Sequence, residues 1–433
     1  MAVVAARRAP GGRRNGQAYR CAGQPRAATL TPVRDEGGSD DPNGGATVGP
    51  TRPALLTPAF VAVTLASLAY FTGDGVLVPA VPRYVQGPLA AGDVAVGLVV
   101  GAFSLSAFFL RPWVGGLGDR WGRRPLMVLG AGLFTVSVLG YGTASSPEAL
   151  AGLRLLTGAG EACFFVGALT AVADLAPAQR RGEAMSLASL ALYVGIGVGP
   201  LLGEVAIERS GFGAAWALAG AAGLAAVAVA VLVPDTRPHD PAPEPGGPAA
   251  GRPLIHPAGL LPGLVLLAGI LGMAGFLTFV PLYALDLGMG GSRVVLLLFA
   301  AVVVGIGGVG AWIPDRLGPA RATRIALALS AAGLAMVGAW RTPAGLVAGT
   351  AVFATGVALL TPAVMTLAVQ GVAPRERGAV IGTTSSFLDL AIGLGPAALG
   401  LVAAAAGRPA TFLASAAGAG AGLVMVVRRP GWK

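Results

Sequence analysis

Charged residues are scarce in this chain of 433 residues, where they make up 12% of the sequence. An ordinary soluble domain carries about 25% charge. Hydrophobic residues reach 55%, and the mean hydropathy is +0.73. This composition excludes a typical soluble globular protein and indicates a chain that lies largely in lipid.

Cysteine and histidine are almost absent, with two of each in the sequence. Cys21 lies in a polar segment and Cys163 in an apolar run, while His239 and His256 both fall between the two halves described below. These residues form neither a disulfide framework nor a metal-ligand pattern. The sequence also has no Gly-x-x-x-x-Gly-Lys-Ser/Thr phosphate loop. We therefore expect no enzyme, no metal, no cofactor and no direct use of ATP.

Long Ala/Val/Leu runs dominate the rest of the chain. A helix needs about 20 residues to cross a hydrocarbon core of roughly 30 Å. By this measure the sequence predicts an all-α integral membrane protein. Twelve spans are expected near residues 57–82, 94–116, 125–144, 148–173, 184–207, 212–233, 258–284, 294–313, 322–340, 344–370, 379–405 and 409–427.

The spans divide into two bundles of six helices, at 54–233 and 258–428. Segment 234–257 is rich in proline and has no apolar run, so we interpret it as a linker. Segment 1–53 carries eight Arg and four acidic residues and is expected to be a disordered cytoplasmic tail, with a second short tail at 429–433.

Basic residues follow this topology. With the N-terminus inside, 23 Lys and Arg fall on the inner side and five on the outer side. The positive-inside rule therefore predicts a multi-pass protein of the inner or plasma membrane with both termini in the cytoplasm. The net positive charge is explained by this topology and does not indicate nucleic-acid binding.

An internal repeat relates the two halves at an offset of 196 residues. The offset superimposes Asp119-Arg120 on Asp315-Arg316, Gly122 on Gly318, Arg181-Gly182 on Arg377-Gly378, and Gly197, Gly199 and Pro200 on Gly393, Gly395 and Pro396. Two halves of equal polarity around a central cavity are typical of transporters that alternate about a midplane site.

The segment from Gly115 to Arg124, Gly-Gly-Leu-Gly-Asp-Arg-Trp-Gly-Arg-Arg, resembles the signature loop of the major facilitator superfamily, and the resemblance extends over about residues 55–428. It implies secondary transport by alternating access. It also implies a conformational latch that holds the outward-facing state, in which Asp119 meets the start of helix eleven and Arg123 pairs with Asp174. The residues assigned to this latch are Gly115, Asp119, Arg120, Gly122, Arg123, Asp174, Asp315 and Arg316. The second copy has Pro319 and Gln370 at the matching positions, so its latch is expected to be weak.

Span five contains Gly195, Gly199, Pro200 and Gly203, which are similar to the antiporter motif of the same family. Small residues four apart allow close helix packing, and proline kinks a helix. The motif departs from the family at Glu204, where relatives have glycine. We expect Glu204 to lie in the solvated interface near the outer end of the span.

Ionisable residues inside spans are functional candidates by default, because burying an unpaired charge is costly. Asp74 and Arg154 lie about 12 Å and 9 Å from the outer surface by helical rise, which predicts a pair between them. The resemblance links Arg154 to proton coupling. A carboxylate for which a proton and a substrate compete would then drive antiport.

Two deeper acids, Glu161 and Asp389, complete the proton-coupling candidates. Glu161 is too deep to pair with Arg154 along a straight helix, so it needs another partner, a cationic substrate or a proton. Asp389 either couples protons or makes a buried bond to a hydroxyl at 383–386. Arg111, at the inner end of span two, is expected to extend its guanidinium to the lipid headgroups.

Aromatic residues are few, at 6% of the sequence. Phe276 and Phe279 form an i,i+3 pair in span seven and are the weak candidates for the substrate cavity, with ordinary packing as the alternative.

These patterns favour a proton-coupled exporter of a drug-like or natural-product small molecule. The stretch from Gly160 to Glu183 is similar to exporters of actinobacterial type. The alternative is an uptake symporter for a sugar or organic anion, although Arg154 is the only basic residue well placed to bind an anion. A more distant alternative is a membrane sensor that does not transport. The expected partners are the substrate, protons and membrane lipid, with the protein a monomer that binds no nucleic acid.

Overall fold

The computed structural model describes residues 55–177, 180–236, 256–309, 316–373, 376–429 and 432. Residues 53–433 form one compact unit. All regular elements in the described ranges are helical. The predicted tail at 1–53 lies outside the described residues, and so does most of the predicted linker at 234–257.

Within the described residues, the first half of the unit contains five α-helices and the short 3₁₀-helix η1. They are α1 (Pro58–Gln86), α2 (Asp93–Trp121), α3 (Arg123–Gly140), η1 (Tyr141–Thr143), α4 (Pro147–Leu175) and α5 (Arg181–Val231). Helix α5 has 51 residues and breaks at Gly211, whose φ is +77°. It therefore covers both of the spans predicted at 184–207 and 212–233.

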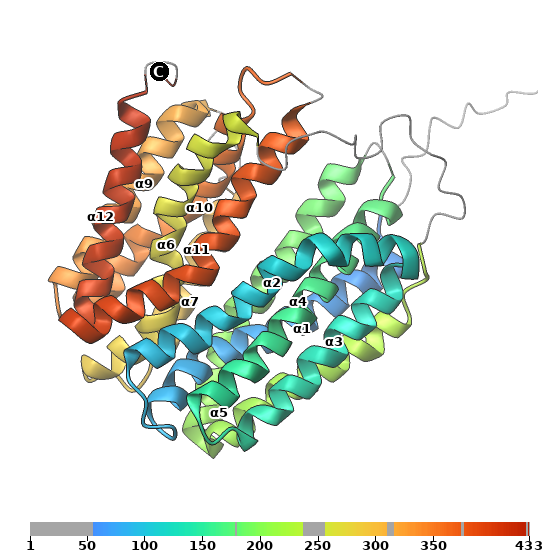
Figure 1. Cartoon of the computed structure of the whole chain (residues 1–433), viewed down its shortest axis with the longest axis horizontal. Coiled ribbons are helices and arrows are strands. Elements are labelled where there is room, and N and C mark those ends of the chain that lie inside the picture. Colours follow the sequence, from blue (N-terminus) through green and yellow to red (C-terminus); the bar gives the residue numbers. More distant parts are fainter. Residues whose placement is uncertain are drawn as a thin grey trace, which may run out of the picture. The chain divides into compact units, whose positions relative to one another are not determined.

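The second half repeats this pattern with separate helices. They are α6 (Pro257–Asp286), α7 (Arg293–Val309), α9 (Pro319–Ala339), α10 (Pro343–Ala368), α11 (Arg377–Ala406) and α12 (Arg408–Val427). Figure 1 shows α6 to α12 running alongside one another, as α1 to α5 do in the first half.

Ten of the described helices are long and apolar enough to cross a membrane, counting α5 once. The apolar part of α7, Arg293–Ile306, is shorter. With α5 accounting for two spans and α7 for the eighth, the helices occupy the twelve predicted positions. The prediction of an all-α membrane protein is confirmed.

Recurrent capping signals explain where the helices begin. Pro58, Pro147 and Pro343 each occupy the first turn, where a missing N–H costs nothing. The hydroxyl before each proline, on Thr57, Ser146 and Thr342, accepts a hydrogen bond of 3.2 Å from the backbone N–H three residues later.

The internal repeat extends to the backbone conformation of the turns. Gly122 and Gly318 have φ of +98° and +77°, and Gly211 and Gly407 have φ of +77° and +80°. The members of each pair lie 196 residues apart in the sequence. Because only glycine adopts this backbone region easily, the same turn chemistry recurs at matching points of the two halves.

We name the two ends of the helical unit after these turns. The Gly122 end holds the α2–α3 turn and the α3 N-terminus, and the Gly211 end holds the break in α5, the C-terminus of α1 and the α11–α12 turn at Gly407. Between the halves, α2 packs on α11, α5 on α7, and α1 on α6.

Candidate functional site

A cavity of about 140 Å³ lies where the two halves meet. Five helices line it: α1, α2 and α4 from the first half and α6 and α11 from the second. Its lining is mostly aliphatic, and four polar side chains face it, those of Asp74, Ser104, Arg154 and Thr278. A small apolar site with a few polar groups is the usual form of a small-molecule binding site.

Arg154 is buried on one wall of the cavity, with 6% of its surface exposed. Its guanidinium lies 4.6 Å from the centroid of the Phe103 ring, in cation–π geometry. The Tyr141 hydroxyl also interacts with Arg154. Its Nε and Nη1 atoms find no hydrogen-bond partner among the described residues. Two donor nitrogens of Arg154, with three N–H groups between them, thus make no hydrogen bond to the described residues.

Asp74 faces the same cavity from the middle of α1. It interacts with Arg154 electrostatically, but within the described ranges neither an ion pair nor a hydrogen bond joins the two side chains. The predicted direct pair is therefore wrong. Helix α1 continues to Gln86, beyond the predicted end of the span, so Asp74 lies about 18 Å from the Gly211 end of its helix and Arg154 about 10 Å.

A triad of charges lies deeper in the bundle. Arg111 on α2 donates from Nη2 to Glu161 Oε1 on α4, at 3.1 Å, and from Nη1 to Asp389 Oδ1 on α11, at 2.5 Å. The side chains of Glu161 and Asp389 are 8% and 20% exposed. The Arg111 guanidinium also lies 5.2 Å from the Phe165 ring centroid. Arg111 thus bridges carboxylates from the two halves.

This arrangement corrects two sequence predictions. Arg111 does not snorkel to headgroups, and Asp389 pairs with Arg111 rather than with a hydroxyl at 383–386. The depth of each charge along its helix indicates this grouping. By helical rise, Arg111, Glu161 and Asp389 lie about 27, 21 and 25 Å from the Gly211 ends of their helices. Three otherwise unpaired charges at similar depth could have been grouped.

Glu204 is fully buried, so its predicted solvated position is wrong. Its Oε1 atom accepts hydrogen bonds from Ser292 N at 3.0 Å and Ser292 Oγ at 2.5 Å. Its Oε2 atom pairs with Arg83. Ser292 directly precedes α7, so Glu204 joins α1 and α5 of the first half to α7 of the second. The departure from the family motif at this position thus has a structural role.

Two further ion pairs link the halves at the Gly211 end. Glu208 pairs with Arg293 at 2.8 Å, and Asp93 with Arg408 at 3.1 Å. Arg408 also contacts Asp286, at 2.6 Å. Together with Glu204 and Ser292, these contacts hold the Gly211 ends of the halves together.

Backbone packing seals the same region between α2 and α11. A Cβ atom on Gly101 would lie 2.6 Å from the Gly393 carbonyl oxygen, and one on Gly97 would clash with the Pro396 carbonyl. The helices approach this closely because both present small residues.

At the Gly122 end, the predicted contact between Arg123 and Asp174 is present, with Nε to Oδ2 at 3.1 Å. Arg123 is 6% exposed and also donates to the Gly118 carbonyl, at 2.8 Å. Its backbone N–H donates to Asp235 Oδ1 at 3.2 Å, just after α5. This set ties α3, α4 and the end of α5 within the first half.

The other latch residues are only partly described. Gly122 forms the tight turn, and Arg120 and Arg316 are exposed. The side-chain surroundings of Gly115 and Asp119, and the whole of Asp315, lie outside the described residues. The predicted meeting of Asp119 with helix eleven therefore stays a prediction.

The helix-five motif packs backbone against backbone on α1. A Cβ atom on Gly195 would lie 2.8 Å from Thr72 N, one on Gly199 2.5 Å from Thr72 O, and one on Gly203 2.6 Å from Val76 O. Pro200 lies inside the same helix. These glycines permit a close approach of α5 to α1.

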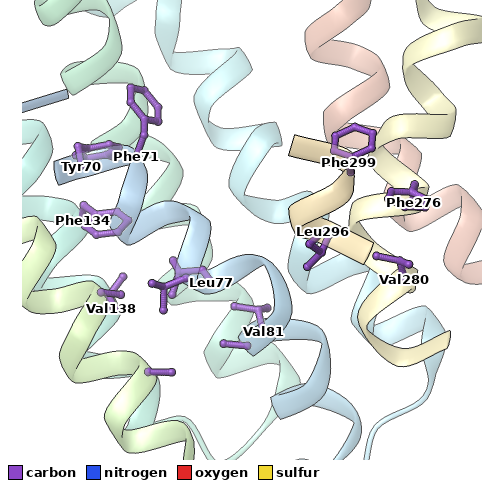
Figure 2. Close-up of a cluster of buried hydrophobic side chains, with 14 of the residues drawn as sticks. Tyr70, Phe71, Leu77, Val81, Phe134, Val138, Phe276, Val280, Leu296 and Phe299 are labelled. Carbon is purple, nitrogen blue, oxygen red and sulfur yellow. The ribbon is translucent and has the colours of Figure 1, made fainter. Parts of the chain in front are cut away.

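Phe276 and Phe279 do not line the cavity, so this weak prediction is wrong. Both are fully buried in the apolar core, and the Phe276 ring stacks on Phe299 of α7 at 5.3 Å. Figure 2 shows Phe276 and Val280 facing α7. The cavity face of α6 carries Met273, Ala274, Leu277 and Thr278 instead. The sequence could not reveal which face of this uniformly apolar helix meets the cavity.

Comparison with known proteins gives a consistent result. The family model described as Major Facilitator Superfamily matches residues 63–396. The chain is 25% identical over 393 residues to the "Uncharacterized MFS-type transporter YhhS" of Escherichia coli strain K12, covering 88% of this chain and 94% of YhhS.

Solved structures share the fold. The crystal structure of a bacterial homologue of the human lysosomal transporter Spinster, inward-facing and unoccupied, matches with a TM-score of 0.70 at 16% identity, over 86% of this chain and 95% of that one. The human organic anion transporter MFSD10 (TETRAN) matches with a TM-score of 0.62 at 20% identity, over 87% and 100%. This multi-pass membrane protein is a transporter rather than an enzyme, and it belongs to the major facilitator superfamily.

Proposed function

We propose that this transporter is a proton-coupled exporter of a drug-like or natural-product small molecule, with the Gly122 end facing the cytoplasm. The observation that carries the proposal is Asp74, a carboxylate in an apolar cavity between the halves with no hydrogen-bond partner among the described residues. A carboxylate without a partner in an apolar cavity is stabilised by a proton or by a cationic ligand. Competition between the two couples their movements.

The triad supplies a reason why protonation changes conformation. Arg111 is shared between Glu161 of the first half and Asp389 of the second. A proton on Asp389 weakens the bond between the halves, while Glu161 still compensates the charge on Arg111. Protonation of Asp389 therefore loosens the α2–α11 contact without leaving an uncompensated arginine.

Alternating access follows from the contacts at the two ends. In this structure Glu204, Glu208 and Asp93 link the halves at the Gly211 end. Opening of that end requires these contacts to break. In the proposed cycle, the predicted contact of Asp119 with helix eleven, on the turn that the Arg123 contacts hold in place, then keeps the opposite state closed at the Gly122 end.

A second candidate is an uptake symporter for an organic anion. It is favoured by one observation: Arg154, which lines the cavity, has two donor nitrogens without a hydrogen-bond partner among the described residues. The human relative by fold, MFSD10, is described as an organic anion transporter.

Proton movement in energised everted vesicles separates these candidates. An exporter that exchanges substrate for protons releases luminal protons when a lipophilic cation or amphoteric amine is added outside. A symporter responds only when substrate is loaded into the lumen. Asp74→Asn should abolish the response, whereas Glu148→Gln, which changes an exposed acid at the start of α4, should not. An unchanged response in Asp74→Asn vesicles would refute the proposal.

A further inference from the structure

We propose that the cavity recognises amphoteric molecules, which carry a basic amine and a separate carboxylate on an apolar body. Asp74 receives the amine and Arg154 receives the carboxylate. The inference deepens the proposed function by naming the substrate class, and rests on it for the view that the cavity is the transport site. Recognition itself depends on neither the direction of transport nor proton coupling.

Arg154 provides the anion-binding side. It is 6% exposed, and its Nε and Nη1 donors have no protein partner in the described part of the chain. Its guanidinium carbon lies over the Phe103 ring, 4.6 Å from the centroid. A guanidinium with free N–H donors binds a carboxylate through charge-assisted hydrogen bonds.

Asp74 provides the cation-binding side. It lines the same cavity, and its carboxylate is bound by no donor of the described residues. Because Asp74 and Arg154 do not form an ion pair with each other, a ligand need not break one to reach either of them. Both groups are therefore available at the same time.

The two charges together select against ligands of a single charge. A plain anion at Arg154 is repelled by Asp74, and a plain cation at Asp74 is repelled by Arg154, across a lining of low polarity. An amphoteric ligand compensates both charges and leaves neither buried without a partner. The cavity thus favours ligands with both groups over those with one.

The internal repeat indicates how such a ligand is oriented. The residues 196 positions after Asp74 and Arg154 are Ile270 and Thr350, so the second half carries neither charge. Thr350 donates its hydroxyl to its own helix, at 2.7 Å. The first half therefore holds both charged groups of the ligand.

The second half receives the apolar body of the ligand. It contributes Met273, Leu277 and Ile392 to the cavity wall. Thr278 donates to the Ala274 carbonyl at 2.7 Å, so toward a ligand it acts only as an acceptor. A ring or aliphatic body between the charged groups matches this wall.

Binding to the purified full-length protein tests the inference without any ion gradient. Two scaffolds of different spacing are used, 4-(aminomethyl)benzoate and ciprofloxacin, each with its methyl ester, which removes the anion, and its N-acetyl derivative, which removes the cation. We expect at least one parent compound to bind about tenfold more tightly than both of its derivatives by titration calorimetry, a difference of about 1.4 kcal/mol.

Two variants assign the groups. In Arg154→Gln the parent acid and its ester should bind equally, while the N-acetyl derivative stays weaker. In Asp74→Asn the parent and its N-acetyl derivative should bind equally, while the ester stays weaker. This crossed pattern cannot arise from misfolding, and Glu148→Gln should reproduce the wild-type pattern.

The inference is overturned if a derivative binds as tightly as its parent to the wild type on both scaffolds, if no compound binds, or if the variants do not show the crossed pattern. Because binding is measured without a gradient, this result is independent of proton release in vesicles. Tight amphoteric binding without proton release would refute the proposed coupling alone, and proton release with plain cations alone would refute this inference alone.

Discussion

Replacing Glu204 should open the Gly211 end of the transporter. Glu204 is fully buried and accepts two hydrogen bonds from Ser292, at 3.0 and 2.5 Å, across the boundary between the halves. A hydrogen bond to a charged group contributes about 1.5–3 kcal/mol. Water replaces part of this in the open state, so we expect Glu204→Ala to shift the equilibrium by about 3 kcal/mol, on the order of a hundredfold.

A cysteine in the cavity reports this shift. Ser104 lines the cavity, and Ser104→Cys changes only one atom. In a background with Cys21 and Cys163 replaced by serine, we expect a membrane-impermeant maleimide, added from the Gly211 side, to label this cysteine at least tenfold faster when Glu204→Ala is present.

Glu208→Ala is the matched control. Its pair with Arg293 also crosses the halves at 2.8 Å, but the two side chains are 31% and 49% exposed. Exposed pairs contribute about 0–1 kcal/mol, so labelling should change less than about fivefold. Equal labelling of Glu204→Ala and the unmodified background, or of the two alanine variants, would refute the view that Glu204 holds this end closed.

Three further predictions follow from the packing and the charges. Asp389→Asn leaves Arg111 paired with Glu161 alone. Substrate-driven proton release should fall about tenfold or more, while calorimetry still detects ligand binding. An unchanged rate of proton release would contradict the role of the triad. Gly199→Val places a Cβ atom 2.5 Å from Thr72 O, and overpacking of this kind costs about 1–3 kcal/mol of stability. The unfolding temperature in detergent should therefore fall. Gly132→Ala, which has open space at its Cβ, should leave the unfolding temperature unchanged. Arg123→Gln removes the partly exposed pair with Asp174, worth about 1 kcal/mol, and should alter the transport rate several-fold without loss of binding; an identical rate would count against the latch.

Much of the fold could be predicted because it depends on patterns along the chain. Apolar run length gives the spans, and the offset of 196 residues marks the repeat. The same offset relates the left-handed glycines of the turns, Gly122 with Gly318 and Gly211 with Gly407. The contact between Arg123 and Asp174 was also accessible, through the family resemblance.

The site was harder to predict because it depends on where helices end and which way their faces turn. A four-residue error at the end of α1 made Asp74 and Arg154 look level with each other. The face of α6 could not be assigned from an apolar sequence without polar markers, which misplaced Phe276. Glu204 and Arg111 each have one partner on the other half, Ser292 and Asp389, and no spacing within one helix encodes such contacts. For Arg111, only the similar depth of the three charges could have indicated the grouping.

The proposal that a proton and the substrate compete for Asp74 is tested most directly by counting protons on binding. The purified transporter is mixed, in weakly buffered solution, with whichever amine of the two scaffolds binds, and the pH change is recorded. By linkage, binding that displaces a proton releases about one proton per molecule bound at a pH where Asp74 is protonated. We predict this release in the wild type and in Glu148→Gln, and its loss in Asp74→Asn at saturating ligand. Binding to the wild type without proton release, or equal release from Asp74→Asn, would contradict the account.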